Sequence, residues 1–307
     1  MKWKMGLLGA VMLLMIELLS SAGQRAVATP NAVLKGVYYK DKVLVLMYHE
    51  ISDNPKIKSI ISPELFKSQL EAIVNQGFNV ISMDDYMAFM LDRKPVPNNA
   101  VLLTFDDGYE SFYTEVYPIL KKMRLTATNF IIVSSIDNPK HIGRPKLSWE
   151  QMKEMKAGGM SFFNHTFDSH QYGPYNAKGD MKPVMSKRLY LKALKRIETK
   201  EEFTLRVTKD LALSERTLRQ NLGNTYGVLA FPYGAYRPEV IQVAKQTDIP
   251  IMFTVNAGIN TRADRIGYRV NAGNQKMNPT KLIQLMKHQG RRKDIRPLTP
   301  YSMLVTV

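Results

Sequence analysis

The sequence alternates strand-like and helix-like segments along most of its length, and this alternation restricts the possible folds more than any other feature. Short apolar runs predict buried strands, and amphipathic stretches that begin at Ser, Asn or Pro predict helices. The predicted strands are 43–48, 78–82, 101–105, 126–133, 160–164, 226–231, 251–255 and 266–270. The predicted helices are 63–76, 83–91, 110–123, 149–156, 201–221, 238–246 and 278–289. This order indicates βα units and a mainly parallel sheet.

The fold class is therefore α/β. Seven or eight parallel strands without a dinucleotide-binding fingerprint favour a closed or distorted (β/α) barrel, with an open doubly wound sheet as the second choice. Pro118 should kink or shorten the helix predicted over 110–123. Residues 171–200 contain several Gly and Pro residues and many cations, which predicts an irregular basic insertion.

The two ends of the chain differ from this pattern. Lys2 and Lys4 precede an apolar run over 5–19, and Ala26-Val27-Ala28 is a small-x-small cleavage signal. We therefore expect a signal peptide over 1–28, either removed or kept as an N-terminal anchor. A linker over 29–40, one domain over 41–290 and a tail over 291–307, first basic and then apolar, would follow. The protein is expected to be exported, and either secreted or held at the cell surface or wall.

The net charge of +16 indicates which classes of partner the protein could bind. Nucleic acid often binds such charge, but no nucleic-acid motif accompanies it and the export signal argues against this partner. An anionic cell-wall polymer is one expected partner, and a surface that is charged only for solubility is the alternative. The chain has no cysteine, which excludes disulfides, and nothing in it indicates an obligate protein partner.

The apolar run 101–105 ends in Asp106-Asp107-Gly108. Neighbouring residues that leave a strand point to opposite sides, so the two carboxylates can have different tasks. One can hold a metal while the other takes a proton. Gly108 allows a sharp exit that exposes both. An ordinary strand-to-helix turn is the alternative reading of these three residues.

Other polar motifs also follow predicted strands, where β/α barrels build their sites. They are His49, the segment 165–170 and Pro232-Tyr233-Gly234. The segment 165–170 contains two of the five histidines, five residues apart, a spacing that favours a loop or tight turn over a helix. Two imidazoles and one carboxylate would leave positions open on a divalent metal for water and substrate.

These motifs resemble those of the polysaccharide deacetylase family (carbohydrate esterase family 4, NodB-type domain). Thr104-Phe105-Asp106-Asp107-Gly108, the histidine pair and Phe231-Pro232-Tyr233-Gly234 carry the resemblance, which covers roughly residues 43–270. It implies a distorted (β/α) barrel whose catalytic domain removes N-acetyl groups from N-acetylglucosamine-type polymers with the help of a metal. The five-residue histidine spacing and Leu46-Met47-Tyr48-His49 resemble the branch that acts on biofilm poly-N-acetylglucosamine. A peptidoglycan-like polymer is the alternative substrate.

The same resemblance implies roles for single residues. Asp106 would be the general base that takes a proton from a metal-bound water. The metal would be zinc, with cobalt or nickel as alternatives, and its ligands would be Asp107, His165 and His170. The backbone N–H of Tyr233 would help to bind the oxyanion. The expected substrate contacts are His49, Tyr109, Pro232 and Tyr233.

Two family features are absent or imperfect. Val228-Leu229-Ala230 stands where the family has an arginine before Phe-Pro-Tyr. Arg269 is the candidate replacement as partner of the base, with a structural role as the alternative. The late Leu-x-His motif has one residue too many at Leu285 to His288, so the general acid is either His288 or His49. These departures leave a catalytically inactive, sugar-binding envelope protein as the alternative function.

Overall fold

The computed structural model describes residues 36–53 and 60–291. The expected signal peptide, most of the expected linker and residues 292–307 of the tail lie outside these ranges. Tyr39, in the described part of that linker, is buried, and its hydroxyl donates to the Ala100 carbonyl at 2.9 Å, so the folded domain begins before residue 41. In the described part of the chain, no helix is both long and apolar enough to cross a bilayer.

An eight-stranded sheet forms the centre of the domain, and every strand pair in it is parallel. Its order is β11-β10-β5-β4-β3-β1-β12, with β2 also paired to β3. The strands are β1 (Val43–Tyr48), β2 (Asn79–Ile81), β3 (Ala100–Asp106), β4 (Thr128–Ile131), β5 (Ser161–Asn164), β10 (Val228–Ala230), β11 (Ile251–Phe253) and β12 (Val270–Asn271). The predicted parallel α/β class is confirmed.

The sheet curls into a distorted barrel. On one edge of β3, β2 pairs with residues 100–102 and β4 with residues 104–106, so two strands share that edge. The segment between β11 and β12 makes single bridges to strands at both ends of the sheet, Gly267 to Phe253 of β11 and Asn260 to Val43 of β1. The strand predicted over 266–270 is therefore mostly wrong: Val270 alone lies in a strand, β12, and Gly267 makes a single bridge to β11. The predicted distorted barrel is confirmed.

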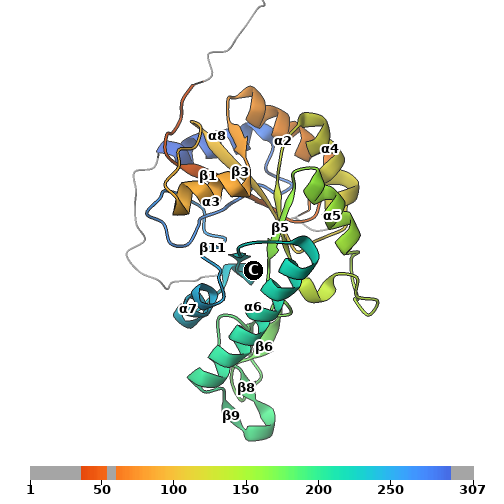
Figure 1. The fold of residues 1–307 in the computed structure, drawn as a ribbon, viewed down its shortest axis with the longest axis vertical. Coiled ribbons are helices and arrows are strands. Elements are labelled where there is room, and N and C mark those ends of the chain that lie inside the picture. Colours follow the sequence, from red (N-terminus) through yellow and green to blue (C-terminus); the bar gives the residue numbers. More distant parts are fainter. Residues whose placement is uncertain (1–35, 54–59, 292–307) are drawn as a thin grey trace, which may run out of the picture. The chain divides into compact units, whose positions relative to one another are not determined.

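Helices surround the strands (Figure 1). They are α2 (Pro63–Asn75), α3 (Met83–Leu91), α4 (Tyr117–Met123), α5 (Trp149–Ala157), α6 (Lys200–Leu222), α7 (Pro238–Gln246) and α8 (Pro279–Arg291). The side chains of Ser62, Ser148 and Thr199 accept backbone N–H groups at the starts of α2, α5 and α6. Such capping satisfies backbone donors that have no partner in the helix, which explains why these helices begin where they do.

Two segments differ from the sequence prediction. The helix predicted over 110–123 is split into a π-helical turn (η1, Phe112–Val116) and α4, with Pro118 in the first turn of α4, where a missing N–H costs little. The insertion 171–200 is not irregular. It contains two antiparallel ribbons, β6 (Tyr172–Pro174) with β7 (Met181–Pro183) and β8 (Tyr190–Leu191) with β9 (Arg196–Ile197).

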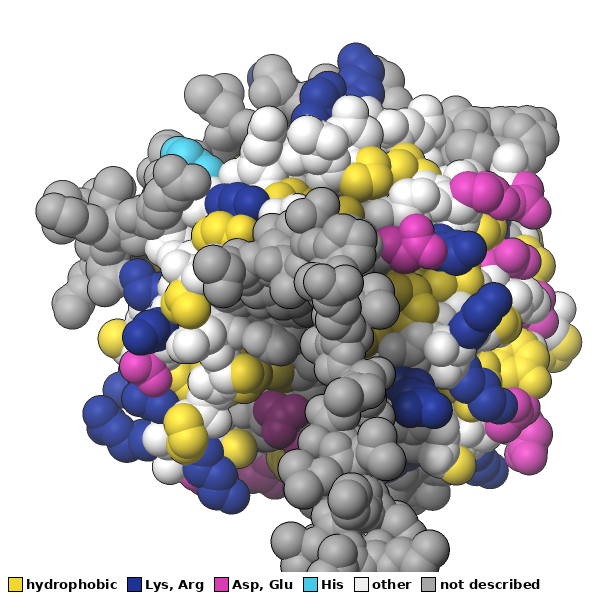
Figure 2. Space-filling model, turned by 90° about the horizontal axis from the view of Figure 1, so that it is seen from above, with side chains coloured by type: hydrophobic (Ala, Val, Ile, Leu, Met, Phe, Trp, Pro, Cys, Tyr) yellow, Lys and Arg dark blue, Asp and Glu magenta, His cyan; other side chains and the backbone are white. Residues whose placement is uncertain are grey.

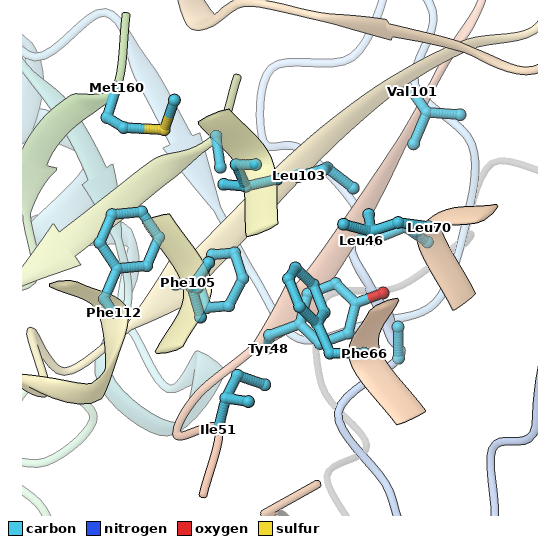
Figure 3. Close-up of a cluster of buried hydrophobic side chains, with 14 of the residues drawn as sticks. Leu46, Tyr48, Ile51, Phe66, Leu70, Val101, Leu103, Phe105, Phe112 and Met160 are labelled. Atoms are coloured by element: carbon cyan, nitrogen blue, oxygen red, sulfur yellow. The ribbon is translucent and has the colours of Figure 1, made fainter. Parts of the chain in front are cut away.

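Side chains from alternate positions of β1 and β3 enter two separate cores. Leu46, Tyr48, Leu103 and Phe105 belong to the larger core, whereas Val45 and Leu102 belong to a second one. In the larger core the Phe105 ring lies 5.1 Å from that of Tyr48 and 4.9 Å from that of Phe112 (Figure 3). Because successive side chains alternate, Asp106 shares the face of Leu102 and not that of Phe105.

Candidate metal centre

The backbone turns sharply where β3 ends. Asp107 (φ 77°) and Gly108 (φ 67°) both adopt the left-handed conformation, which glycine enters freely and aspartate tolerates better than most residues. A Cβ atom on Gly108 would also lie 3.1 Å from Cδ1 of Ile131. Two successive left-handed residues aim the carboxylates of Asp106 and Asp107 at different partners.

Asp107, His165 and His170 each bring one ligand atom to a common point, within 4.8 Å of one another. Oδ1 of Asp107 lies 3.5 Å from Nε2 of His165 and 3.2 Å from Nε2 of His170. Ligand atoms held at about 2.0–2.2 Å around a tetrahedral zinc ion are separated by roughly the same distances. Within the described residues this buried oxygen has no hydrogen-bond partner. A divalent cation would satisfy it, so the three side chains fit a metal site.

The protonation of both imidazoles suits them to bind a metal. Nδ1 of His165 lies 2.8 Å from the carbonyl oxygen of Ala230, the last residue of β10. Since a carbonyl only accepts, Nδ1 carries the proton and Nε2 presents its lone pair. Burial, together with the neighbouring His165, lowers the pKa of His170 to about 4, so its ring is neutral near pH 7. Burial by itself would raise the pKa of Asp107, but the surrounding imidazoles outweigh it and hold that pKa below its ordinary value.

The segment 165–170 is a loop, as its histidine spacing predicts. Thr166 adopts a left-handed conformation (φ 75°), and the ring centres of His165 and His170 lie 4.9 Å apart. The two rings meet because the chain folds back between them. A regular helix would separate side chains five residues apart.

Asp106 faces a different partner. Its two carboxylate oxygens accept from the two terminal nitrogens of Arg269 at 2.7 and 2.8 Å, and both side chains are buried. Nε of Arg269 donates to the Thr254 carbonyl at 2.9 Å, which restrains the guanidinium. Burial acts to raise the pKa of Asp106, but the charge of Arg269 outweighs it, and the pKa lies below its ordinary value. Asp106 is therefore ionised. Because both of its oxygens pair with Arg269, its carboxylate is not one of the three candidate metal ligands.

Tyr233 follows β10 and adopts a left-handed conformation (φ 58°). Its ring centre lies 4.4 Å from that of His170, and its hydroxyl donates to the His170 carbonyl at 3.3 Å. The ring is 38% exposed, so it borders the site and can be reached from solvent. Pro232, the other residue of this turn predicted to contact substrate, is buried directly before Tyr233.

A cavity of about 320 Å³ opens beside the ligand set. His49 and Tyr109, the other predicted substrate contacts, line it together with Asp107. Nδ1 of His49 is buried and has no partner among the described residues. The structure thus brings both predicted residues to one wall of the cavity, next to the candidate metal site.

The cavity also contains charged residues that the sequence did not indicate. Nζ of Lys146 donates to the Asp107 carbonyl at 2.8 Å and lies 3.8 Å from the ring centre of Tyr109. Arg144 forms an ion pair with Glu50 on the same wall. The segment that carries Arg144 and Lys146 has no periodic pattern or motif. The one available signal was the position of Glu50 directly after His49 at the end of β1.

The prediction that His288 is the general acid is not supported by its position. His288 is exposed on the last turns of α8, and the nearby Gly290 packs against Tyr39. Tyr39 in turn contacts Ala100, at the start of β3. Asp106 lies at the other end of this seven-residue strand, about 20 Å away at the usual rise per residue. His288 therefore belongs to the opposite end of the barrel.

Fold and site together define a distorted β/α-barrel protein that carries a candidate metal centre at the carboxyl ends of its strands. The chain belongs to the polysaccharide deacetylase family, whose pattern it matches over residues 93–252.

Individual relatives agree with this assignment. The chain is 27% identical over 229 residues to the poly-beta-1,6-N-acetyl-D-glucosamine N-deacetylase of Escherichia coli K12, in an alignment that covers 70% of this chain and 34% of that protein. It thus spans about a third of the length of this relative. It is 26% identical to the Staphylococcus aureus MRSA252 protein of the same name, over 71% of this chain and 73% of that one. A de-N-acetylase structure from Aggregatibacter actinomycetemcomitans superposes with a TM-score of 0.73 at 26% identity, over 80% of this chain and 100% of that one.

Proposed function

We propose that this protein is a metal-dependent N-deacetylase that removes N-acetyl groups from an N-acetylglucosamine polysaccharide. The observation that carries the proposal is the convergence of Asp107, His165 and His170 beside an ionised Asp106. The names of the relatives favour poly-beta-1,6-N-acetylglucosamine as the polymer over a peptidoglycan-like one. The catalytic domain would be the described barrel.

A divalent ion bound to the three ligands would polarise the acetyl carbonyl and lower the pKa of water. Zinc suits two imidazoles and one carboxylate, and cobalt or nickel accept the same ligands. Asp106 has the role of general base, since it is ionised and has no bond to the ligand set. Arg269 holds its carboxylate in one orientation and stabilises its charge.

The oxyanion that forms during hydrolysis needs a donor. We assign this role to the backbone N–H of Tyr233, because the left-handed turn after β10 brings this residue against His170. The exposed part of the Tyr233 ring and the Tyr109 ring offer apolar faces to a sugar. Nζ of Lys146 lies 3.8 Å from the centre of the Tyr109 ring and limits the freedom of this ring.

The departing amine needs a proton, and His49 is our candidate for its donor. It lines the cavity beside Asp107, and the unpaired Nδ1 leaves this imidazole without a structural task on that side. This choice replaces His288, which lies at the far end of the barrel. A general acid of this kind typically contributes 10²- to 10⁴-fold to the rate.

The alternative is a catalytically inactive, sugar-binding envelope protein. Two departures from the family pattern favour it: the arginine missing before Phe231 and the extra residue in the Leu-x-His motif at Leu285 to His288. Arg269 supplies the guanidinium from a different segment, which weakens the first reason, and His49 offers an acid in place of His288. The test is acetate release by purified protein from acetylated glucosamine oligomers, with and without chelator, beside a His165→Ala variant. Metal binding without acetate release would favour the binding protein.

We further propose that the protein is exported and that the ribbons of 171–200 bind an anionic envelope polymer. Figure 1 shows these ribbons alongside α6, away from the sheet. Their exposed cations include Lys178, Lys182, Arg188, Lys192 and Lys195. On the face that Figure 2 shows, by contrast, basic and acidic side chains are interspersed. Replacing three of these lysines by Glu should abolish retention on an immobilised teichoic-type polymer and leave acetate release unchanged. Unchanged retention would contradict this part of the proposal.

A further inference from the structure

Helix α6 contacts the loop that carries both histidine ligands. The carboxylate of Asp210, on α6, accepts the backbone N–H of Phe167 at 3.0 Å and that of Asp168 at 2.9 Å. These two N–H groups are consecutive and lie midway between His165 and His170. One partly buried side chain therefore holds the middle of the loop with both of its oxygens.

The same helix also holds the start of the loop. The Asn164 amide donates to Glu215 at 2.8 Å, and its oxygen accepts from the Ser214 hydroxyl at 2.8 Å and from the Thr166 N–H at 2.6 Å. Asn164 is the last residue of β5, so the strand already fixes its backbone. Beyond Thr166 the backbone N–H of Ser134 donates to the Phe167 carbonyl at 2.8 Å, and its hydroxyl donates to the Asp168 carboxylate at 3.0 Å. Asp210 is the charged group of α6 that binds the N–H groups of the same two residues.

We propose that Asp210 is a positioning residue of the metal centre: by binding the N–H groups of Phe167 and Asp168, it sets the separation of His165 and His170. This inference rests on the metal site proposed above. It concerns a residue that would touch neither the metal nor the substrate.

The physical argument depends on the conformation of the loop. Thr166 is held in a left-handed conformation that a threonine rarely adopts, so the loop has to be restrained from outside. Two N–H donors to one carboxylate are charge-assisted hydrogen bonds, which are stronger than neutral ones. An amide at position 210 could accept only one of them and would point its own N–H₂ group at the other. Without the carboxylate the loop would relax and the Nε2 atoms would no longer meet at one oxygen.

The test compares metal binding in Asp210→Asn and Asp210→Ala with the wild-type protein. The matched control is Asp248→Asn, which removes an exposed carboxylate that pairs with Arg219 at 3.5 Å. Cobalt affinity is measured by competition with a chelator, and the visible spectrum of bound cobalt reports the geometry of its ligands. Losses from residues that orient metal ligands are typically 10- to 100-fold. We expect a loss in this range for Asp210→Ala, a smaller loss for Asp210→Asn, an altered spectrum for both, and no change for the control.

The outcomes separate this inference from the proposed function. Absence of metal binding by the wild-type protein would overturn the metal site itself. Wild-type affinity and spectrum in folded Asp210 variants would overturn only the role of Asp210. Circular dichroism of the metal-free proteins shows whether each variant folds, and if Asp210→Ala does not, Asp210→Asn carries the test. Faster amide exchange at Phe167 and Asp168 in that variant is also expected, and unchanged exchange would contradict the inference.

Discussion

Arg269 and Asp106, 163 positions apart in the chain, form a buried ion pair with two parallel hydrogen bonds of 2.7 and 2.8 Å. The arginine precedes β12 and the aspartate ends β3. The two strands are separated in the sheet only by β1. The pair supplies the partner of the proposed base, and it does so from a segment that carries none of the recognised motifs.

Breaking this pair should destabilise the protein strongly. Arg269→Met would leave the buried charge of Asp106 without a partner, which typically costs about 3–5 kcal/mol. Urea unfolding measures the loss. The matched control is Arg196→Met, which removes an equally bidentate but exposed pair with Glu202 and should change the stability far less, because water screens exposed charges. The double variant Asp106→Asn/Arg269→Met should recover part of the stability, and no recovery would mean that the charge of Asp106 is not the cause.

A milder change at the same position should move the pH dependence of activity. Arg269→Lys keeps a positive charge but loses the bidentate geometry, so the pKa of Asp106 should rise. The acid limb of kcat/KM should then shift to higher pH. An unshifted limb together with a lower kcat would indicate that Arg269 positions the substrate and does not control the ionisation of Asp106.

Metal binding should stabilise the fold. A ligand at 100 times its Kd adds about 2.7 kcal/mol to the free energy of unfolding. Thermal unfolding with zinc or with chelator measures this difference. It should disappear in His170→Ala and persist in His141→Ala, whose imidazole contacts the Arg144 carbonyl and not the ligand set. An equal zinc effect in both variants would place the metal elsewhere.

The stability of the metal-free protein should depend on His170. The pKa of this group is about 4 in the folded protein and about 6.5 as a free side chain, so between these values the unfolded chain binds more protons. Stability should therefore fall by about 2–3 kcal/mol as the pH is lowered from 6.5 towards 4. Chemical unfolding across this range tests the prediction. His170→Gln should flatten the curve there, and an unchanged slope would contradict it.

The choice of general acid can be tested with two histidine variants. His49→Gln should lower kcat by about 10²- to 10⁴-fold and leave metal affinity unchanged. His288→Gln, at the other end of the barrel, should leave kcat unchanged. The measurement is acetate release at saturating substrate, beside a metal titration of each variant. A lower kcat in His288→Gln together with an unchanged kcat in His49→Gln would make His288 the candidate acid in place of His49.

Much of the architecture could be predicted from local patterns. Apolar runs and capping residues identified most strands and all seven described α-helices, one of them shortened to α4. The predictions were less accurate for the segments 171–200 and 266–270. In the first, strands of two or three residues pair only with each other. In the second, single bridges close the barrel, and neither arrangement produces a periodic pattern.

The sequence by itself determined the alternation of strands and helices and the polar motifs that follow the strands, because hydrophobic periodicity and capping act between residues close in the chain. Only the tertiary structure decided that Arg269 meets Asp106, that His49 and not His288 lies near the ligand set, and that Lys146 and Arg144 line the cavity. These contacts depend on strand order and on the path of irregular loops. Both are set by packing between distant segments, which leaves no local signal in the sequence.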